Sequence, residues 1–521
     1  MSKRILCMLL VLCVAMTLFA GCNGDTGGTG SSGSSKTEAS VDSGTDSSKA
    51  GSGADINFDE EPYEINYLYL VAQEGANQGK VAQAVSDLAL EELNMTVNLI
   101  PMTFGTYNQQ IAMMLAANEP LDIFLSFSTS FSTYIESQYV VNLADYLEET
   151  KDAAAVLGDD AYTGYIGDFL IGYGQMKERG YPTGLVVRKD IFEELGYSVE
   201  DFSVTTDDYS TYGQITDLFA KVKESYPNMV ALDGTLIMGM GTESYFDSMG
   251  SSFGVLENYG QTTTVTNWYE SEQYRNFAEI GREWFTKGYS SSDIAVNQDS
   301  GEIKMKAGNA FSYITYIKPN THVEKLAQTG YEVSVIPLGE GVKTSNAVNS
   351  ALISIANASK DPKKAAQFLN WTYISQEFND LINWGIEGED WVLTEDGMAA
   401  YPEGVDAASV GYHNDFGFVY PNQFAGHAWE GNPVDIWEQY AVYNDGLMVS
   451  QAFGFTFDST PVANEEAQLN TVLEQYQKDI AFGAVDIESA IQEFNDALYA
   501  AGLQKVMDEK QSQLDAWLAN Q

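Results

Sequence analysis

The chain has 521 residues, a formal net charge of −48 at pH 7 and an aromatic content of 12%. This acidic balance argues against nucleic acid or an anionic membrane surface as a partner, because both require a basic face on the protein. The three cysteines, Cys7, Cys13 and Cys22, all lie near the start of the chain, so the body has no thiol for a disulfide, a zinc site or a nucleophile.

The first 21 residues have the pattern of a secretory signal peptide. Lys3 and Arg4 precede an apolar run that ends at Phe19, and this run is shorter than the roughly 20 residues that span a bilayer. The sequence Leu18-Phe19-Ala20-Gly21-Cys22 follows and resembles the lipobox of bacterial lipoproteins. The resemblance implies a lipoprotein signal peptide over 1–21 and lipidation of Cys22. The alternative is an ordinary signal peptide with an unrelated cysteine.

Residues 22–55 have the composition of a tether. They consist almost wholly of Gly, Ser, Thr, Asp, Lys and Ala, a composition that has nothing to bury and stays disordered. A Gly/Ser coil of about 30 residues reaches on the order of 30 Å. We therefore expect a lipid anchor on the extracellular face of a bacterial cell membrane, then a flexible linker, then a folded body.

The first part of the body predicts alternating strands and helices. A nearly continuous apolar run over 63–71 predicts a buried strand, and two more strands are expected over 96–100 and 121–125. Apolar residues at helical spacing over 81–88 and 107–115 predict a helix in each interval. The alternation predicts parallel pairing in an α/β sheet.

The ends of these strands supply the first candidate binding residues. In open α/β sheets, ligands lie beyond the carboxyl ends of the strands. This rule selects Gln73 and Glu74 after the first strand, and Ser126 and Phe127 at the end of the third.

The second part of the body begins with a connection rich in Gly and Pro over 180–190. Strands are expected over 310–317, 331–338 and 346–356, and a helix follows, with Asp361 as its N-cap before Pro362. Two helices are expected at the C-terminus. About 465 residues after the tether exceed what one hydrophobic core usually takes, so two lobes are expected.

Several segments in this order resemble the extracellular solute-binding proteins of ABC importers, the family that includes the maltose-binding protein. The segments run over 112–123, 181–192, 349–369, 384–388 and 457–518, and they include Tyr181-Pro182-Thr183-Gly184-Leu185-Val186-Val187-Arg188-Lys189-Asp190 at a first crossover between lobes. The last two resemble a longer lipoprotein branch of Gram-positive bacteria.

The resemblance implies a two-lobed α/β fold of the periplasmic-binding-protein type (type II), with mostly parallel sheets flanked by helices and a multi-strand hinge. Lobe 1 is expected to comprise 56–182 with about 350–420, and lobe 2 to comprise 183–349 with about 421–521. The family presents a bound ligand to permease subunits and does no chemistry. We therefore expect a monomeric binding protein without catalytic residues, metal or cofactor.

A carbohydrate is the expected ligand. Sugar hydroxyls suit planar polar groups and sugar faces suit aromatic rings, so a binding cleft mixes Trp or Tyr with Asp, Glu, Asn and Gln. Beyond the strand-end residues, the candidates in loops or near strand ends are Tyr245, Trp268, Tyr316, Asn349, Trp384 and Glu387. Each aromatic residue taken singly is as well or better explained as part of a core.

Other functions stay open from the sequence. The family also carries peptides, polyamines and metal chelates, although the three scattered histidines, His322, His413 and His427, weigh against a metal. A cell-surface glycoside hydrolase needs only two suitably placed carboxylates, and Glu387, Glu389 and Asp390 lie together. A sensory or adhesive protein is a third class. The sequence Gly250-Ser251-Ser252-Phe253-Gly254 matches G-x-S-x-G, but a poor strand precedes it.

Overall fold

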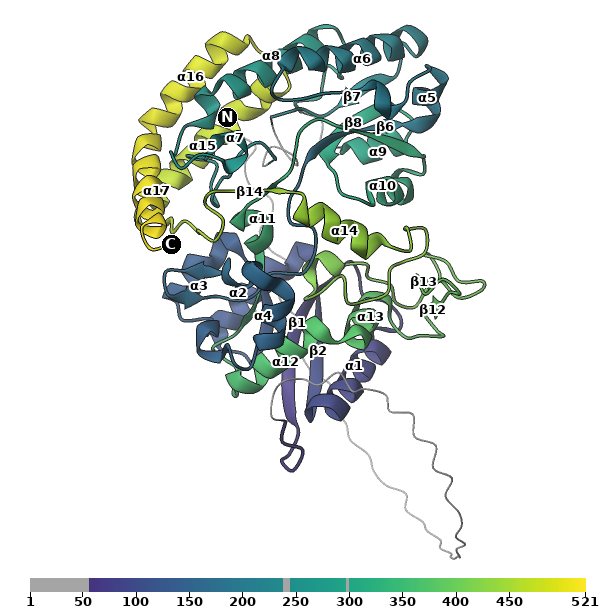
Figure 1. Cartoon of the computed structure of the whole chain (residues 1–521), viewed down its shortest axis with the longest axis vertical. Helices are drawn as coiled ribbons and strands as arrows, with labels where there is room; N and C mark the ends of the chain where they lie inside the picture. Colours follow the sequence, from purple (N-terminus) through teal and green to yellow (C-terminus); the bar gives the residue numbers. More distant parts are fainter. Residues whose placement is uncertain (1–55, 238–243, 297–298) are drawn as a thin grey trace, which may run out of the picture. The chain divides into compact units, whose positions relative to one another are not determined.

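The computed structural model describes residues 56–237, 244–296 and 299–521 (Figure 1). The signal peptide, the lipidated Cys22 and the linker expected over 1–55 lie outside the described residues. The described part of the chain contains no helix that is both long enough and apolar enough to cross a membrane.

The first sheet contains the strands expected near the start of the body. Its order is β11-β3-β1-β2, with β1 parallel to β2 and β3, and with β11 antiparallel to β3. The strands are β1 (Tyr63–Val71), β2 (Met95–Thr103), β3 (Ile123–Phe127) and β11 (Ala351–Ile355). Helices associated with this sheet are α1 (Gln78–Leu93), α2 (Phe104–Ala117), α3 (Phe131–Glu136), α4 (Lys151–Leu157), α12 (Pro362–Ile374) and α13 (Gln376–Trp384).

The second sheet has the order β7-β8-β6-β9 and is mixed, whereas a mostly parallel sheet was expected. Strand β6 runs antiparallel to β8 and β9, and β7 runs parallel to β8. The strands are β6 (Thr183–Arg188), β7 (Val230–Asp233), β8 (Ala310–Tyr316) and β9 (Val333–Pro337). The accompanying helices are α5 (Lys189–Glu194), α6 (Gly213–Ser225), α7 (Glu257–Gly260), α8 (Glu272–Thr286), α9 (Gly301–Lys306), α10 (Thr321–Thr329), α15 (Ala463–Ala481), α16 (Ile487–Ala500) and α17 (Leu503–Leu518).

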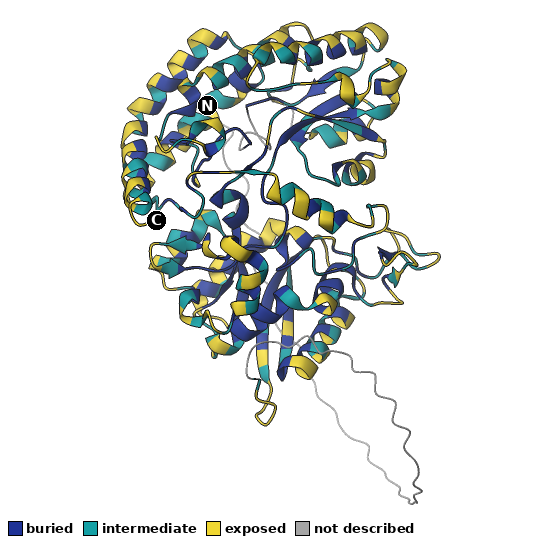
Figure 2. Cartoon of the chain, viewed as in Figure 1, coloured by how far each residue is buried: buried dark blue, intermediate teal, exposed yellow. Residues whose placement is uncertain are grey.

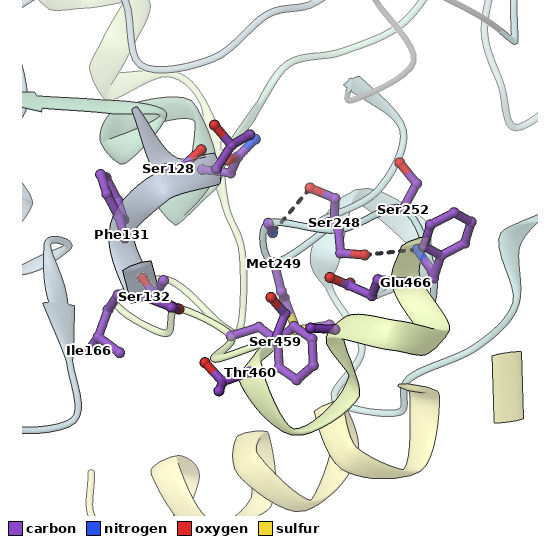
Figure 3. Close-up of a pocket in the computed structure, with 18 of the residues that line it drawn as sticks. Ser128, Phe131, Ser132, Ile166, Ser248, Met249, Ser252, Ser459, Thr460 and Glu466 are labelled. Carbon is purple, nitrogen blue, oxygen red and sulfur yellow. Dashed lines mark hydrogen bonds between the residues drawn. The ribbon is translucent and has the colours of Figure 1, made fainter. Parts of the chain in front are cut away.

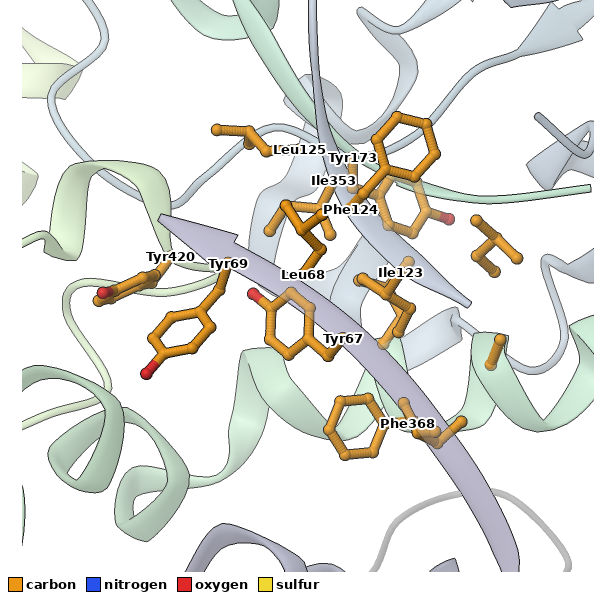
Figure 4. Close-up of a cluster of buried hydrophobic side chains, with 14 of the residues drawn as sticks. Tyr67, Leu68, Tyr69, Ile123, Phe124, Leu125, Tyr173, Ile353, Phe368 and Tyr420 are labelled. Carbon is orange, nitrogen blue, oxygen red and sulfur yellow. The ribbon is translucent and has the colours of Figure 1, made fainter. Parts of the chain in front are cut away.

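Each sheet has its own hydrophobic core, so the expected two-lobed α/β fold is confirmed. The first core draws its residues from 65–173 and 351–420, and the second from 185–338 and 452–514. Figure 4 shows part of the first core, where Tyr67 on β1 packs against Phe368 on α12, and Figure 2 shows buried positions throughout both sheets. We call the parts built around these two cores lobe 1 and lobe 2.

Local sequence signals explain where several helices begin. Asp361 caps α12, accepting a hydrogen bond from the Lys364 amide, and Pro362 is the first helical residue, as predicted. The strand expected over 346–356 is shorter than predicted, because its first part is the helix α11 (Ser345–Asn349). The Thr344 side chain caps this helix by accepting from the Ala347 amide, which favours helix over strand here.

Three segments of the chain pass between the lobes. One runs into β6, one contains β10 (Val342–Lys343) and α11, and one contains β14 (Met448–Val449), which pairs with β10. The first packs tightly on β11, because a Cβ on Gly172 would lie 2.4 Å from the Ile353 carbonyl oxygen. The remaining elements are α14 (Ile436–Asp445) and the short strands β4 (Tyr165–Ile166), β5 (Phe169–Leu170), β12 (Val392–Leu393) and β13 (Ala399–Ala400).

A buried carboxylate joins two of these segments. Asp160 of lobe 1 is 2% exposed; its Oδ2 lies 2.5 Å from Arg179 Nε and its Oδ1 lies 2.6 Å from Lys343 Nζ. Arg179 precedes β6 and Lys343 lies on β10. One buried anion therefore binds a cation from each of two connecting segments.

Replacing Asp160 by Asn should destabilise the protein by about 3 kcal/mol or more, because two cations lose their buried partner. Urea-induced unfolding followed by tryptophan fluorescence measures the change. Glu488→Gln is the matched control, since it breaks the exposed Arg275–Glu488 pair, and it should cost less than about 1 kcal/mol. Equal effects of the two substitutions would contradict the role given to Asp160.

Candidate ligand-binding cleft

The larger of two hollows described here has a volume of about 920 Å³ and is lined by residues of both lobes and by the segments between them. Its size is that of a small-molecule site. Seven aromatic rings lie among the polar and charged residues of its wall, and we call it the aromatic hollow. The lining rings are those of Tyr181, Tyr316, Trp384, Phe416, Phe418, Trp429 and Trp437.

Packing and hydrogen bonds fix the tryptophans. Trp384 ends α13, and its indole Nε1 donates to the His427 carbonyl at 3.0 Å. Its ring lies 4.8 Å from that of Trp429, which in turn lies 4.4 Å from the His413 ring. Burial lowers the pKa of His413 to about 4, so this imidazole is neutral at pH 7. The cluster therefore presents rigid, uncharged rings to the hollow.

A second pair of rings comes from the connecting segment and from lobe 2. Tyr181 precedes β6 and Tyr316 ends β8, and their ring centroids lie 5.0 Å apart. Lys177 Nζ donates to the Tyr181 hydroxyl at 2.6 Å. Tyr181 thus lies where the chain passes from one lobe to the other, and its ring lies beside that of Tyr316 of lobe 2.

Asp415 is the most unusual polar residue of this hollow. Its φ of 49° lies in the left-handed region, which costs energy for a residue other than glycine and recurs at ligand-binding sites. Asp415 is exposed to the hollow. Desolvation by the protein around it raises the pKa of its carboxyl group to about 6. The preceding Asn414 fixes its place, because Asn414 Oδ1 accepts from the Ala72 amide just beyond β1 at 3.1 Å.

Further charged groups alternate in sign around the hollow. Lys318 Nζ lies 3.2 Å from Glu324 Oε2 and 3.8 Å from Glu178 Oε1. His427 Nδ1 lies 2.7 Å from Asp380 Oδ2, and the His427 amide donates to the other carboxylate oxygen. Because carboxylates, amines, an imidazole and aromatic faces converge here, the hollow suits a ligand that combines hydroxyl groups with apolar faces.

The second hollow, of about 610 Å³, is rich in serine and threonine hydroxyl groups, and we call it the hydroxyl-lined hollow (Figure 3). Helix α11 supplies part of its wall, and the Tyr181 hydroxyl donates to the Ala347 carbonyl of α11 at 3.3 Å. The two hollows are therefore linked by direct contact between their lining elements. The hydroxyl residues that line this second hollow are Ser128, Thr129, Ser132, Thr133, Ser248, Ser251, Ser252, Ser345, Thr456, Ser459 and Thr460.

Three of the residues predicted from sequence line these hollows. Tyr316 and Trp384 come together in the aromatic hollow. Asn349 lines the hydroxyl-lined hollow, where its Nδ2 donates to the Thr163 carbonyl at 2.7 Å and to Thr456 Oγ1 at 3.0 Å.

The other predicted residues line neither hollow. Tyr245 and Trp268 are 0% and 2% exposed in the second core. Ser126 is buried, with its hydroxyl donating to the Leu352 carbonyl, and the Phe127 ring packs edge-on against Tyr107. The remaining three, Gln73, Glu74 and Glu387, are exposed.

Two of the three carboxylates considered for glycoside hydrolysis are engaged elsewhere, and the third, Glu387, is exposed and lines neither hollow. Glu389 pairs with Lys80. Asp390 is 0% exposed, and its two oxygens accept hydrogen bonds from Asn77 Nδ2 and the Ile386 amide. The stretch from Gly250 to Gly254 is a turn without the strand and helix of a nucleophile elbow. Within the described residues, no group of three or more His, Cys, Asp or Glu side chains is placed to hold a metal ion.

Sequence reasoning missed Tyr181, Asp415 and Trp429. Tyr181 had a usable signal, since it lies between Gly180 and Pro182 at the predicted crossover. Asp415 and Trp429 lie in a long stretch with little regular structure between α13 and α14. Only tertiary contacts bring that stretch to the hollow.

These features define a two-lobed binding protein, and comparison with known sequences agrees. Residues 74–373 match the family described as bacterial extracellular solute-binding protein. That match covers more than half of the chain, so the protein belongs to this family, as its sequence indicated. Residues 451–519 match a second family, described as a domain of unknown function (DUF3502).

Individual relatives share the same class. A carbohydrate ABC transporter substrate-binding protein of Streptococcus pneumoniae serotype 4 is 20% identical over 465 residues, which cover 87% of this chain and 91% of the relative. The crystal structure of the N-glycan transport solute binding protein NgtS from Streptococcus pneumoniae matches with a TM-score of 0.76 at 18% identity, covering 88% of this chain and 99% of that chain. The alginate-binding protein AlgQ2 without calcium ion matches with a TM-score of 0.56 at 14% identity, covering 90% and 100%. These two structures show the shared fold.

Replacing Asp415 by Asn should stabilise the protein at pH 7.5 more than at pH 4.5. The raised carboxyl pKa means that the folded state favours the protonated form, so ionisation of Asp415 lowers the free energy of unfolding as pH rises from about 4 to about 6. Asparagine removes the charge and tolerates a left-handed φ. Thermal unfolding at both pH values measures the difference. Asp445→Asn, at the exposed end of α14, is the control, and a pH-independent effect of Asp415→Asn would contradict the assignment.

Proposed function

We propose that this protein captures an oligosaccharide outside the cell and delivers it unchanged to the permease subunits of an ABC transporter. The observation that carries the proposal is the aromatic hollow, which Trp384, Trp429, Tyr181 and Tyr316 line together with the exposed carboxylate of Asp415. Pyranose rings have apolar faces that pack on aromatic rings, while their hydroxyl groups require acceptors and donors around the rim. The lining of this hollow supplies both.

The alternation of charges favours a polar, uncharged ligand. The lysines of the aromatic hollow are paired with hydroxyl or carboxylate groups, as Lys177 is with Tyr181 and Lys318 is with Glu324. Such pairs form hydrogen bonds with the hydroxyl groups of a ligand that carries no net charge. An anionic ligand would instead meet Asp415 and Glu178.

The size of the ligand follows from the two hollows. Their lining elements are joined by the hydrogen bond from Tyr181 to Ala347 of α11, and we infer that one ligand extends from one hollow to the other. An elongated glycan fits this arrangement. The names of similar proteins, which include N-glycan transport and kestose-bound solute binding proteins, support a carbohydrate.

The remaining expectations complete the proposal. Cys22 carries a lipid that anchors the protein to the outer face of the membrane, and the linker up to residue 55 gives the body reach. Lobe 1 comprises 56–182 with about 350–420, and lobe 2 comprises 183–349 with about 421–521. The protein acts as a monomer and does not cleave its ligand.

A thermal-shift screen of mono- and oligosaccharides, short peptides and polyamines tests the ligand class. A ligand at 100 times its dissociation constant adds about 2.7 kcal/mol to the stability of the folded state, so a true ligand gives a clear shift. A shift with one glycan class is the expected result. A response to peptides or polyamines alone would overturn the choice of carbohydrate.

Trp429→Ala should weaken binding of the glycan found in that screen by at least about tenfold, because an aromatic face is lost; tenfold corresponds to about 1.4 kcal/mol. Isothermal titration calorimetry measures the affinity. Tyr499→Ala is the matched control, since Tyr499 is a 38% exposed aromatic residue on α16, remote from the lining of both hollows. Equal affinities for the Trp429→Ala variant and the unmodified protein would contradict the proposal that the aromatic hollow binds the glycan.

A further inference from the structure

A fully buried lysine contacts one wall of the hydroxyl-lined hollow. Lys510 lies on α17 and is 0% exposed. Its Nζ donates to three carbonyl oxygens, those of Ser248 at 3.1 Å, Ser251 at 2.8 Å and Gly254 at 2.8 Å. All three acceptors belong to one loop, residues 248–254, which we call the clamped loop.

The clamped loop forms the wall of the hollow in a backbone conformation that needs support. Every residue from Ser248 to Phe253 lines the hollow, and Figure 3 shows Ser248, Met249 and Ser252 along it. Met249 has a φ of 51°, a left-handed value that is uncommon for a residue other than glycine, and Gly250 and Gly254 have φ values of 97° and 89°. The hydrogen bonds from Lys510 Nζ to the three backbone carbonyls stabilise this conformation.

The number of donors matches the number of acceptors only when Lys510 is charged. A protonated lysine has three N–H donors, one for each of the three carbonyls. A neutral amine has two hydrogens, so deprotonation leaves one buried carbonyl without a partner, which is unfavourable. The protonation state of Lys510 therefore bears directly on the clamped loop.

Burial and the groups that face Lys510 together set its pKa near neutrality. Asp247 at the start of the loop and Glu466 on α15 attract its charge, and its Nζ lies 5.0 Å from the centroid of the Phe457 ring. Burial outweighs these attractions and lowers the pKa of Lys510 to about 7, from an ordinary value of 10.5. Glu466 also lines the hollow (Figure 3).

We propose that Lys510 is a positioning residue for ligand binding, and that its protonated form holds the clamped loop as a wall of the hydroxyl-lined hollow. Glycan affinity then falls as pH rises past neutrality. This inference rests on the proposed carbohydrate-binding function.

The expected pH dependence of binding is opposite in sign to that of stability. Between about pH 7 and pH 10 the unfolded chain keeps the proton on Lys510 while the folded protein loses it, so the contribution of Lys510 to the free energy of unfolding rises with pH. Affinity falls over the same range, because fewer molecules have an ordered loop. A lysine with only a structural role would change stability without changing affinity.

The probe is Man5GlcNAc, which is bound in another crystal structure of the similar protein NgtS. Calorimetric titration with Man5GlcNAc at pH 6, 7, 8 and 9 tests the proposal. The competent fraction falls about tenfold between pH 6 and pH 8 for a group that titrates near 7, so the apparent Kd should rise about tenfold. Lys510→Met should bind weakly at every pH, with this pH dependence removed. Lys505→Met is the control on the same helix, where Lys505 is 59% exposed, and it should follow the unmodified protein. A profile of the unmodified protein that matches that of Lys510→Met would overturn the proposal.

Hydrogen–deuterium exchange of the unliganded protein tests the role of Lys510 in the clamped loop separately from glycan binding, because it needs no ligand. After correction for intrinsic exchange rates, amides of the clamped loop should lose protection between pH 6 and pH 8 in the unmodified protein. If that loss is seen but Man5GlcNAc binds at no pH, the proposed binding of this glycan fails and the role of Lys510 in the loop stands. If protection of the loop does not change with pH, the role of Lys510 fails. The pH series of the unmodified protein decides this even if Lys510→Met does not fold.

Discussion

The arrangement of the two lobes depends on how the connecting segments are held together. Asp160 is the main polar contact among them, because it binds Arg179 ahead of β6 and Lys343 on β10 within a buried site. Disrupting a buried anion that binds two cations is energetically costly. The site lies where the chain passes from one lobe to the other. The connecting segments also supply Tyr181 to the aromatic hollow and helix α11 to the hydroxyl-lined hollow.

Around this junction the protein concentrates energetically unfavourable features that a purely structural region would avoid. Asp415 combines a left-handed backbone with a carboxylate whose ionisation is disfavoured by its surroundings. The clamped loop combines left-handed residues with a fully buried lysine. Strain and desolvated charges of this kind recur where a protein is organised to bind. Both features lie at the walls of the hollows, and Met249 and Phe253 of the clamped loop also belong to the core of lobe 2.

Local sequence predicted the regular part of the fold well, whereas it indicated few of the residues that line the two hollows. Strands β1 to β3 and the Asp361 cap follow from local periodicity and capping, which operate over a few residues. Trp384 and Tyr316 were identified because they lie near the ends of regular elements. Tyr245 and Trp268 were equally aromatic, but the helices of lobe 2 cover them in its core. Asp415 and Trp429 reach the hollow only through contacts such as that of Asn414 with the end of β1, and local sequence carries no signal for them.

The central claim is that the cleft binds a carbohydrate and releases it chemically unchanged. The most direct measurement incubates the protein with its bound glycan for many turnover times of a typical hydrolase and then analyses the released glycan by mass spectrometry. The account predicts retention of the glycan by the protein during gel filtration and a released glycan of unaltered mass. Shortened glycan products, or no retained glycan of any class, would contradict it.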